Sequence, residues 1–255
     1  MPVDNELKGR LALITGASGG IGGACARDLA RHGVHLALTY SKNKESVDVL
    51  IKELRAIDPS LLRISSHQVD MVSATQIQHL FEEIEQQHNT LPDILVSNAG
   101  HGKRIPDIVD ISLEEFDFTL SVNLRSSFIL TKACVPHMRS QRWGRIILMS
   151  SIAARGGGVN GCHYAASKAG LEGLGKNLAR KLAGEGITVN CVAPAMIGET
   201  RMIPNAEYLN GTPGDVRNIP VGRLGTPDET AQVVTMFIKT GYATGQTCLL
   251  AGGLL

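Results

Sequence analysis

The sequence predicts an α/β fold, a single-domain doubly wound arrangement in which helices cover both faces of a seven-stranded parallel sheet. Short apolar runs alternate with longer segments of helical periodicity along the chain. Near-continuous apolar runs are typical of strands buried on both faces, and strict strand–helix alternation favours parallel pairing. The expected strands are 10–15, 34–39, 62–70, 93–98, 145–150, 187–193 and 246–251, and the expected helices are about 22–32, 44–57, 73–89, 112–140, 163–184 and 227–239.

Length and composition agree with this fold and exclude several classes of protein. The 255 residues suit one large α/β domain, and a hydrophobic content of 43% is enough for a full core. The net charge is +1 with acids and bases interleaved, so no nucleic-acid-binding surface is indicated. No apolar run is long enough to span a membrane, and residues 1–10 do not resemble a targeting peptide. Five scattered cysteines indicate reduced thiols, and no Cys/His spacing predicts a metal site, so we expect a cytoplasmic protein without metal.

A glycine-rich turn, Thr15-Gly-Ala-Ser-Gly-Gly-Ile-Gly22, joins the first expected strand to the first expected helix. Glycines at this place let the backbone turn tightly and approach a pyrophosphate at the helix N-terminus. Many tight turns are rich in glycine, so the composition alone is weak evidence. Its position between a strand and a helix makes a dinucleotide site the stronger interpretation. The candidate cofactor-binding residues here are Gly16, Ser18, Gly20, Ile21 and Gly22.

Tyr164 and Lys168 are four residues apart in a segment rich in Ala, Leu and Lys. This spacing predicts a helix that carries both side chains on one face. A free tyrosine has a pKa of about 10, and a nearby, partly desolvated ammonium would lower it. An isolated pair of this kind usually belongs to an ordinary helix surface. Here, however, Ser151 closes an expected buried strand, and open α/β sheets place their sites at the C-terminal ends of strands.

Together, the glycine turn, the strand-terminal serine and the Tyr-x-x-x-Lys pair resemble the short-chain dehydrogenase/reductase family over nearly the whole chain. In general appearance the sequence is similar to the 3-oxoacyl-carrier-protein reductases of that family. The resemblance implies a Rossmann fold, a homo-oligomer that is commonly a tetramer, and the catalytic residues Asn123, Ser151, Tyr164 and Lys168. It also implies that Asn123 holds a helix irregularity and a water that relays protons to Lys168.

The end of the second strand indicates which nicotinamide cofactor is bound. NAD sites place an acid there, on the ribose 2′-hydroxyl. This chain instead reads Thr39-Tyr-Ser-Lys-Asn43, with one cation and no acid, which favours the 2′-phosphate of NADP(H). Gly19 stands where many NADP-type relatives have arginine, and Lys42 could also be an ordinary solvated lysine. The candidates are Tyr40, Ser41, Lys42 and Asn43.

The resemblance implies further cofactor contacts along the chain. Asp70 would lie at the adenine edge, although an acid near a helix N-cap is an equally good interpretation. Asn98-Ala-Gly100 would support the sheet and line the adenine–ribose path. Ala195 replaces the family's glycine, and residues 196–202 are one residue longer than usual. The remaining expected contacts are Asn98, Ala99, Gly100, Pro194, Ile197 and Thr200, with Tyr164 and Lys168 also at the cofactor.

We therefore expect one domain over 1–255, with a cofactor-binding part at about 8–150, a catalytic and substrate part at about 151–255 and a mobile lid at about 195–222. The expected function is NADPH-dependent reduction of a ketone, with 3-oxoacyl and small polyketide-like compounds among the candidate substrates. An NAD-linked alcohol or polyol dehydrogenase is the alternative. A catalytically silent cofactor-binding scaffold or sensor is the alternative from another class, and neither His101 nor His163 is expected to be essential.

Overall fold

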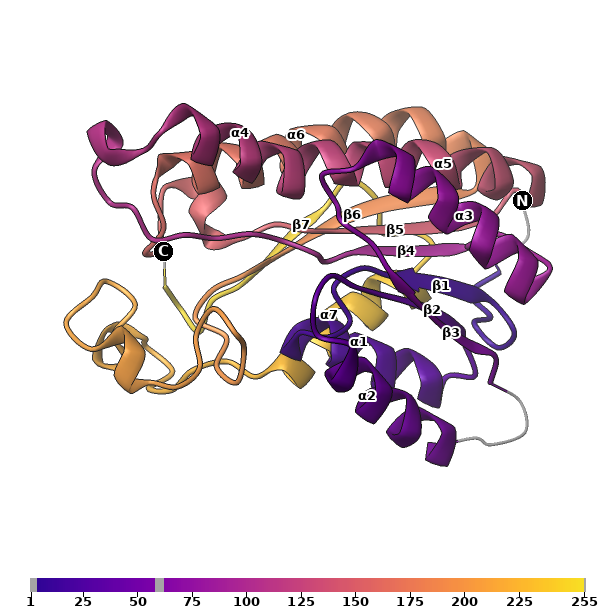
Figure 1. Ribbon diagram of the computed structural model, residues 1–255, viewed down its shortest axis with the longest axis horizontal. Helices are drawn as coiled ribbons and strands as arrows, with labels where there is room; N and C mark the ends of the chain where they lie inside the picture. Colours follow the sequence, from indigo (N-terminus) through magenta and orange to yellow (C-terminus); the bar gives the residue numbers. More distant parts are fainter. Residues whose placement is uncertain (1–3, 58–61, 255) are drawn as a thin grey trace.

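The computed structural model describes residues 4–57 and 62–254, which fold around one seven-stranded sheet (Figure 1). All neighbouring strands are parallel, in the order β3-β2-β1-β4-β5-β6-β7. The predicted fold class is therefore confirmed. The strand order reverses between β1 and β4, which is where doubly wound sheets open a crevice for ligands. The strands are β1 (Leu11–Ile14), β2 (His35–Tyr40), β3 (Ile64–Gln68), β4 (Ile94–Ser97), β5 (Gly144–Met149), β6 (Ile187–Pro194) and β7 (Thr247–Leu250).

Helices cover both faces of this sheet, as Figure 1 shows. Alternate strand residues point to opposite faces, so Ala12 and Ile14 join one buried apolar cluster while Leu11 and Leu13 join the other. The first cluster is closed by α1, α2 and α7, and the second by α3, α5 and α6. The helices are α1 (Gly20–Arg31), α2 (Lys44–Ile57), α3 (Ala74–His88), α4 (Leu113–Leu120), α5 (Ser126–Gln141), α6 (Cys162–Leu182) and α7 (Pro227–Lys239).

The start of α7 shows how local sequence sets a helix boundary. The Thr226 hydroxyl accepts from the Glu229 backbone N–H at 3.2 Å, and the Glu229 carboxylate accepts from the Thr226 N–H at 2.9 Å. This capping box satisfies two backbone donors, and Pro227 occupies the first helical position, where its missing N–H costs nothing. The boundary expected from the sequence is confirmed.

The single helix expected over 112–140 is interrupted. Residues Ser121–Arg125 form one π-helical turn between α4 and α5. A π turn inserts one residue into an otherwise helical run, and such insertions are frequent at functional sites. Asn123 lies in the middle of this turn and is 1% exposed.

The segment between β6 and α7 extends beyond the C-terminal edge of the sheet in Figure 1. It contains short 3-10 turns at Glu207–Leu209 and Val216–Asn218. Ile203, Leu209 and Ile219 bury themselves in a small apolar cluster of this segment. Within 4–57 and 62–254, no helix is long and apolar enough to cross a membrane.

Candidate active site

Tyr164 and Lys168 lie one turn apart on α6, facing the C-terminal end of β5. Both are buried, with exposed fractions of 6% and 3%. Lys168 Nζ donates to the Met149 carbonyl oxygen at 2.7 Å and lies 5.5 Å from the centre of the Tyr164 ring. Ser151 follows β5, and its hydroxyl accepts from the Ala153 backbone N–H at 3.2 Å. The helix and its shared face are as the sequence predicts.

Burial shifts the pKa values of both members of this pair. It raises the pKa of Tyr164 to about 12, against a smaller lowering by the Ser151 hydroxyl. Burial also lowers the pKa of Lys168 to about 8. The expectation that Lys168 lowers the Tyr164 pKa is wrong for this structure, because desolvation of the phenolate is the largest effect. Tyr164 is consequently a protonated phenol at neutral pH, which is the form that can donate a proton.

Asn123 connects the loop after β4 to the helix that carries Tyr164. Its carboxamide oxygen accepts from the His101 backbone N–H at 2.7 Å, and its Nδ2 donates to the His101 carbonyl at 2.9 Å. Nδ2 also donates to Ser167 Oγ at 2.9 Å, and that hydroxyl donates to the Tyr164 carbonyl at 2.7 Å. A methyl group added at Gly100 would lie 3.5 Å from both Asn123 Oδ1 and Lys168 Nζ. The structure therefore brings Asn123 and Lys168 close to one another beside Gly100.

Ser167 is a site residue to which the sequence reasoning gave no role. It lies within the run Tyr164-Ala-Ala-Ser-Lys168, directly before Lys168, and is fully buried. Its hydroxyl links Asn123 to the first turns of α6. Serine inside a helix often bonds back to a carbonyl of the preceding turn. That preference, together with its place in the motif, was the available signal.

The glycine turn is shaped for close backbone approach. Gly16 has a φ of +67°, and a methyl group at Gly22 would lie 2.4 Å from the Gly16 carbonyl oxygen. Gly19 caps α1 without a side-chain hydrogen bond, and no acidic residue occupies the first turn. The first N–H groups of a helix have no intrahelical partner and attract anions. The turn thus fits a phosphate group.

The segment Asn98–Gly100 is fixed to this turn. Asn98 Nδ2 donates to the Thr15 carbonyl at 2.9 Å and to the Gly16 carbonyl at 3.3 Å. The Thr15 hydroxyl accepts from the backbone N–H groups of Asn98 and Ala99 at 3.0 and 2.9 Å. The carboxyl ends of β1 and β4 are therefore held together at the point where the strand order reverses.

Two of the polar side chains around the loop after β2 already have hydrogen-bond partners within the chain. Lys44 Nζ donates to Asp48 at 2.8 Å, and Asn43 Oδ1 accepts from the Ser46 backbone N–H at 3.1 Å. Tyr40 is buried, whereas Ser41 and Lys42 are exposed. Lys42 has no hydrogen bond or ion pair with the described residues. Because Lys44 is paired with Asp48, Lys42 is the one cation of this loop without a partner among the described residues.

Asp70 lies between β3 and α3. Its Oδ1 accepts from the Val72 N–H at 3.0 Å, and its own N–H donates to Gln76 Oε1 at 2.8 Å. Ser73, rather than Asp70, caps α3. Asp70 therefore organises the turn that leads into the helix, which agrees with its reading as an acid near a helix N-cap.

The residues after β6 fold into a tight loop beside the glycine turn. Pro194 ends β6, and the left-handed conformations lie at Met196 and Glu199, not at Ala195. The Thr200 hydroxyl donates to the Ile197 carbonyl at 3.1 Å. A methyl group at Gly20 would lie 2.6 Å from the Glu199 carbonyl oxygen, so this loop packs against the start of α1.

The two histidines near Tyr164 have different surroundings. His101 Nε2 lies 2.7 Å from Glu115 Oε1, and its ring meets Phe118 edge-on. His163 is fully buried, and neither of its ring nitrogens has a hydrogen-bond partner among the described residues. Neither ring contacts the Tyr164 hydroxyl through any hydrogen bond of the described chain.

Known proteins resemble this chain over nearly its whole length. A family model described as enoyl-(acyl carrier protein) reductase matches residues 16–255. The chain is 37% identical to the 3-oxoacyl-[acyl-carrier-protein] reductase FabG of Rickettsia bellii, over 98% of both proteins. The chain belongs to the short-chain dehydrogenase/reductase family. Another member, from Thermotoga maritima and with the same reductase name, is 36% identical over 98% of this chain and 99% of its own.

Solved structures of short-chain dehydrogenases/reductases share the fold. A double mutant of the Serratia marcescens enzyme superposes with a TM-score of 0.86 at 31% identity, covering 97% of this chain and 98% of that one. A dehydrogenase/reductase from Sinorhizobium meliloti gives a TM-score of 0.88 at 31% identity, over 98% and 96% of the two chains.

Proposed function

We propose that this short-chain dehydrogenase/reductase uses NADPH to reduce a ketone to a secondary alcohol, with 3-oxoacyl thioesters as the substrate class. The observation that carries the proposal is the buried phenol of Tyr164 on α6, with Lys168 Nζ 5.5 Å from the centre of its ring and Ser151 at the end of the adjoining strand β5. It lies at the same edge of the sheet as a glycine turn that fits a phosphate. The reductase names of the relatives support the substrate class.

The described residues divide into groups that would hold the dinucleotide. The glycine turn would bind the pyrophosphate, and Ser41 with Lys42 would face the adenosine 2′-phosphate. Pro194, Ile197 and Thr200 would lie along the nicotinamide, and Tyr164 with Lys168 at its ribose. In this scheme, residues of about 8–150 bind cofactor, and those of about 151–255 supply catalysis and the substrate surface. The further proposed contacts are Gly16, Ser18, Gly20, Ile21, Gly22, Tyr40, Asn43, Asp70, Asn98, Ala99 and Gly100.

When bound, NADPH supplies the hydride that forms the new C–H bond. Ser151 donates a hydrogen bond to the carbonyl oxygen and stabilises its developing negative charge. Tyr164 gives its proton to that oxygen as the general acid. An alkoxide is a stronger base than a phenolate, so even a phenol with a pKa of about 12 transfers its proton downhill. The proton lost by Tyr164 would be replaced from solvent through Lys168 and a water held by Asn123.

A substrate panel tests this proposal. NADPH oxidation should be measured with 3-oxoacyl thioesters, small ketones and 2-enoyl thioesters of the same chain length. Turnover is expected with the carbonyl compounds. Turnover of only the 2-enoyl thioesters would favour the activity that the family model's description names. Tight NADPH binding without turnover of any compound would favour the scaffold alternative.

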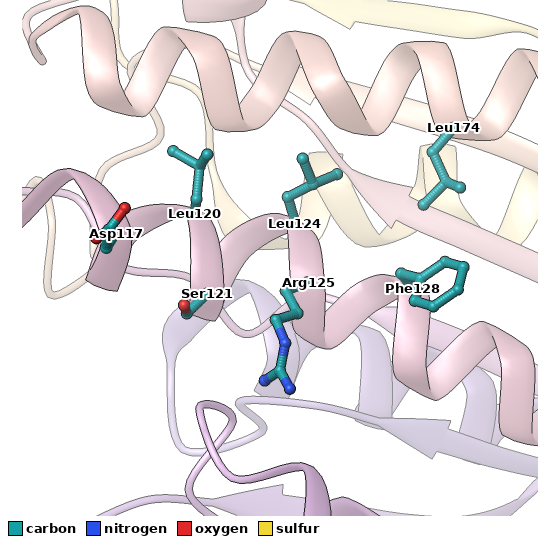
Figure 2. Close-up of a pocket in the computed structure, with 7 residues that line it drawn as sticks. All are labelled: Asp117, Leu120, Ser121, Leu124, Arg125, Phe128 and Leu174. Atoms are coloured by element: carbon teal, nitrogen blue, oxygen red, sulfur yellow. The ribbon is translucent and has the colours of Figure 1, made fainter.

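We further propose that the enzyme assembles with copies of itself through α4, α5 and α6. An open hollow of about 660 Å³ lies between these helices. Figure 2 shows Leu120 and Leu124 pointing toward α6 and Leu174 pointing back. Its lining combines the apolar side chains of Leu120, Leu124, Phe128 and Leu174 with the charged Asp117 and Arg125, and a twofold-related copy would cover this apolar surface with its own.

A further inference from the structure

The segment between β6 and α7 ends its first loop in a tight turn. The Thr200 backbone N–H donates to the Ile203 carbonyl at 3.2 Å, and the Ile203 N–H donates to Thr200 Oγ1 at 3.0 Å. Ile203 is buried in the apolar cluster of this segment and anchors the turn. The two residues at the tip, Arg201 and Met202, are exposed. The turn therefore fixes the backbone at Met202, while its side chain stays partly exposed.

Met202 and Tyr164 flank Gly102, in the loop after β4. A methyl group added at Gly102 would lie 2.7 Å from Met202 Cε, 3.2 Å from Tyr164 Cε2 and 3.3 Å from Asn160 Nδ2. Asn160 Nδ2 also lies 3.8 Å from the Met202 sulfur. Met202 is 37% exposed, whereas Tyr164 is only 6% exposed. Glycine at position 102 is what leaves room for the thioether beside the phenol ring.

We propose that Met202 is a movable cover on Tyr164, and that it selects substrates by the bulk of the groups beside the carbonyl carbon. This inference rests on the proposed reductase function, because it assigns specificity to the same site. Methionine is unbranched and flexible, and its amide contact here is a weak hydrogen bond. The side chain can therefore swing aside while the turn stays in place. Narrow, flexible apolar chains require a small displacement, and branched or aromatic groups require a large one.

The first test measures access to the phenol and needs no turnover. Tyrosines are acetylated with N-acetylimidazole, and each site is quantified by mass spectrometry. Tyr242, which is fully exposed, serves as the internal reference. Met202→Ala should raise the Tyr164 rate relative to Tyr242 by about tenfold, since one covering side chain is lost. Met236→Ala removes an exposed methionine from α7 and should leave the ratio unchanged.

Gly102→Ala provides an independent variant, because its methyl group displaces Met202 directly. If Gly102→Ala acts only by displacing the Met202 side chain, the double variant Gly102→Ala/Met202→Ala should expose Tyr164 no more than Met202→Ala does alone. An unchanged Tyr164 rate in Met202→Ala, or equal acceleration by Met236→Ala, would overturn the proposal. Because this readout is independent of turnover, its failure is distinguishable from failure of the reductase function.

The second test compares kcat/KM for an unbranched 3-oxoacyl thioester and an aryl ketone. Met202→Ala should shift the ratio toward the aryl ketone by about tenfold, and Met202→Phe should shift it the other way, since pocket contacts of this size discriminate by roughly 10- to 200-fold. Met236→Ala should keep the wild-type ratio. Equal ratios in all variants, in an enzyme that does reduce ketones, would refute the specificity role alone.

Discussion

The ammonium of Lys168 donates a hydrogen bond to the backbone carbonyl of Met149 at 2.7 Å. Met149 ends β5, and Lys168 lies one turn along α6 from Tyr164. The bond therefore ties the helix that carries the phenol to the strand that leads into Ser151. Lys168 has a structural partner in addition to its proposed catalytic role, and experiment can separate the two.

Replacing Lys168 by methionine should abolish most activity without unfolding the protein. The variant leaves the Met149 carbonyl unpaired, which costs about 1–3 kcal/mol. It also removes a buried charge, whose cost is visible in the lowered Lys168 pKa of about 8. These effects oppose each other, so the free energy of unfolding should change by less than ~2 kcal/mol. The activity should fall by about 100-fold or more.

Urea unfolding and NADPH-dependent turnover measure these two quantities. Lys176→Met is the matched control, since Lys176 is exposed on the same helix. Near-normal turnover of Lys168→Met would remove Lys168 from the mechanism.

Tyr164→Phe should fold and still bind NADPH while losing about 10²- to 10⁴-fold in kcat, because only the transferable proton is removed. Binding is measured by NADPH fluorescence, and turnover with a 3-oxoacyl thioester. Tyr242→Phe, at a fully exposed position, controls for the substitution itself. A Tyr164→Phe enzyme with nearly unchanged kcat would show that another group supplies the proton.

A buried chain of polar groups links β3 to α3, away from the proposed active site. Ser65 Oγ lies 2.8 Å from both His67 Nε2 and His88 Nε2, and His67 Nδ1 lies 2.7 Å from Glu83 Oε2. The network is satisfied when His67 donates to Glu83, Ser65 donates to His67, and His88 donates to Ser65. His88 Nδ1 then has no partner among the described residues. Burial, with Arg63 nearby, lowers the His88 pKa to about 4.

The enzyme should therefore lose stability as the pH falls from 6.5 toward 4. Unfolded His88, with its ordinary pKa of 6.5, takes up a proton in this window, whereas folded His88 stays neutral. The contribution of neutral His88 to the free energy of unfolding is complete above pH 6.5. It decreases by up to about 3 kcal/mol as the pH falls to 4. Trp143, the single tryptophan, reports urea unfolding by fluorescence.

His88→Gln preserves a donor toward Ser65 but cannot titrate, so its stability should depend less steeply on pH. His79→Gln changes an exposed histidine of the same helix and should retain the wild-type slope. If the free energy of unfolding of His88→Gln depended on pH as steeply as that of the wild type, His88 would not be the source of the pH dependence.

The sheet and the helix boundaries were predictable because buried strands and helix caps depend on residues that are close together in the sequence. Strands buried on both faces appear as continuous apolar runs, and Thr226-Pro-Asp-Glu229 specifies the start of α7. The Lys44–Asp48 pair is equally local, since opposite charges at i,i+4 on a helix attract each other.

Other features depend on packing between distant segments. The π turn at Ser121–Arg125 was expected only through family resemblance, because one inserted residue hardly changes helical periodicity. The raised Tyr164 pKa reflects burial, which a sequence spacing of four residues cannot show. The approach of Met202 to Gly102 likewise joins loops from different ends of the chain.

Assembly through α4–α6 predicts a specific effect of Phe128. This side chain is 51% exposed in the single chain and lines the hollow of Figure 2. Phe128→Glu would bury a carboxylate in the proposed interface without disturbing the core, so the variant should sediment as a smaller species than wild type. Val49→Glu, on the exposed side of α2, should retain the wild-type assembly. A wild type that is monomeric at micromolar concentration would contradict the interface.

The cofactor preference should favour NADPH through Lys42. The 2′-phosphate adds up to two negative charges, and no acid lies between Thr39 and Lys44 to repel it. Lys44 is held by Asp48, which leaves Lys42 as the cation without a partner in this loop of the described chain. An exposed lysine–phosphate contact contributes up to about 1 kcal/mol, and a hydrogen-bonded one about 1.5–3 kcal/mol. A preference of tens-fold, rather than thousands-fold, is expected.

The measurement is kcat/KM with NADPH and NADH at low and moderate salt. Lys42→Asp should remove the preference, because it replaces attraction by repulsion at the phosphate. Lys44→Ala should change it less, since Asp48 already offsets that charge. The wild-type preference should also decrease as salt rises, because exposed charges are screened over about 10 Å at 0.1 M. Equal use of NADH by the wild type, or unaltered discrimination in Lys42→Asp, would show that this loop does not select the cofactor.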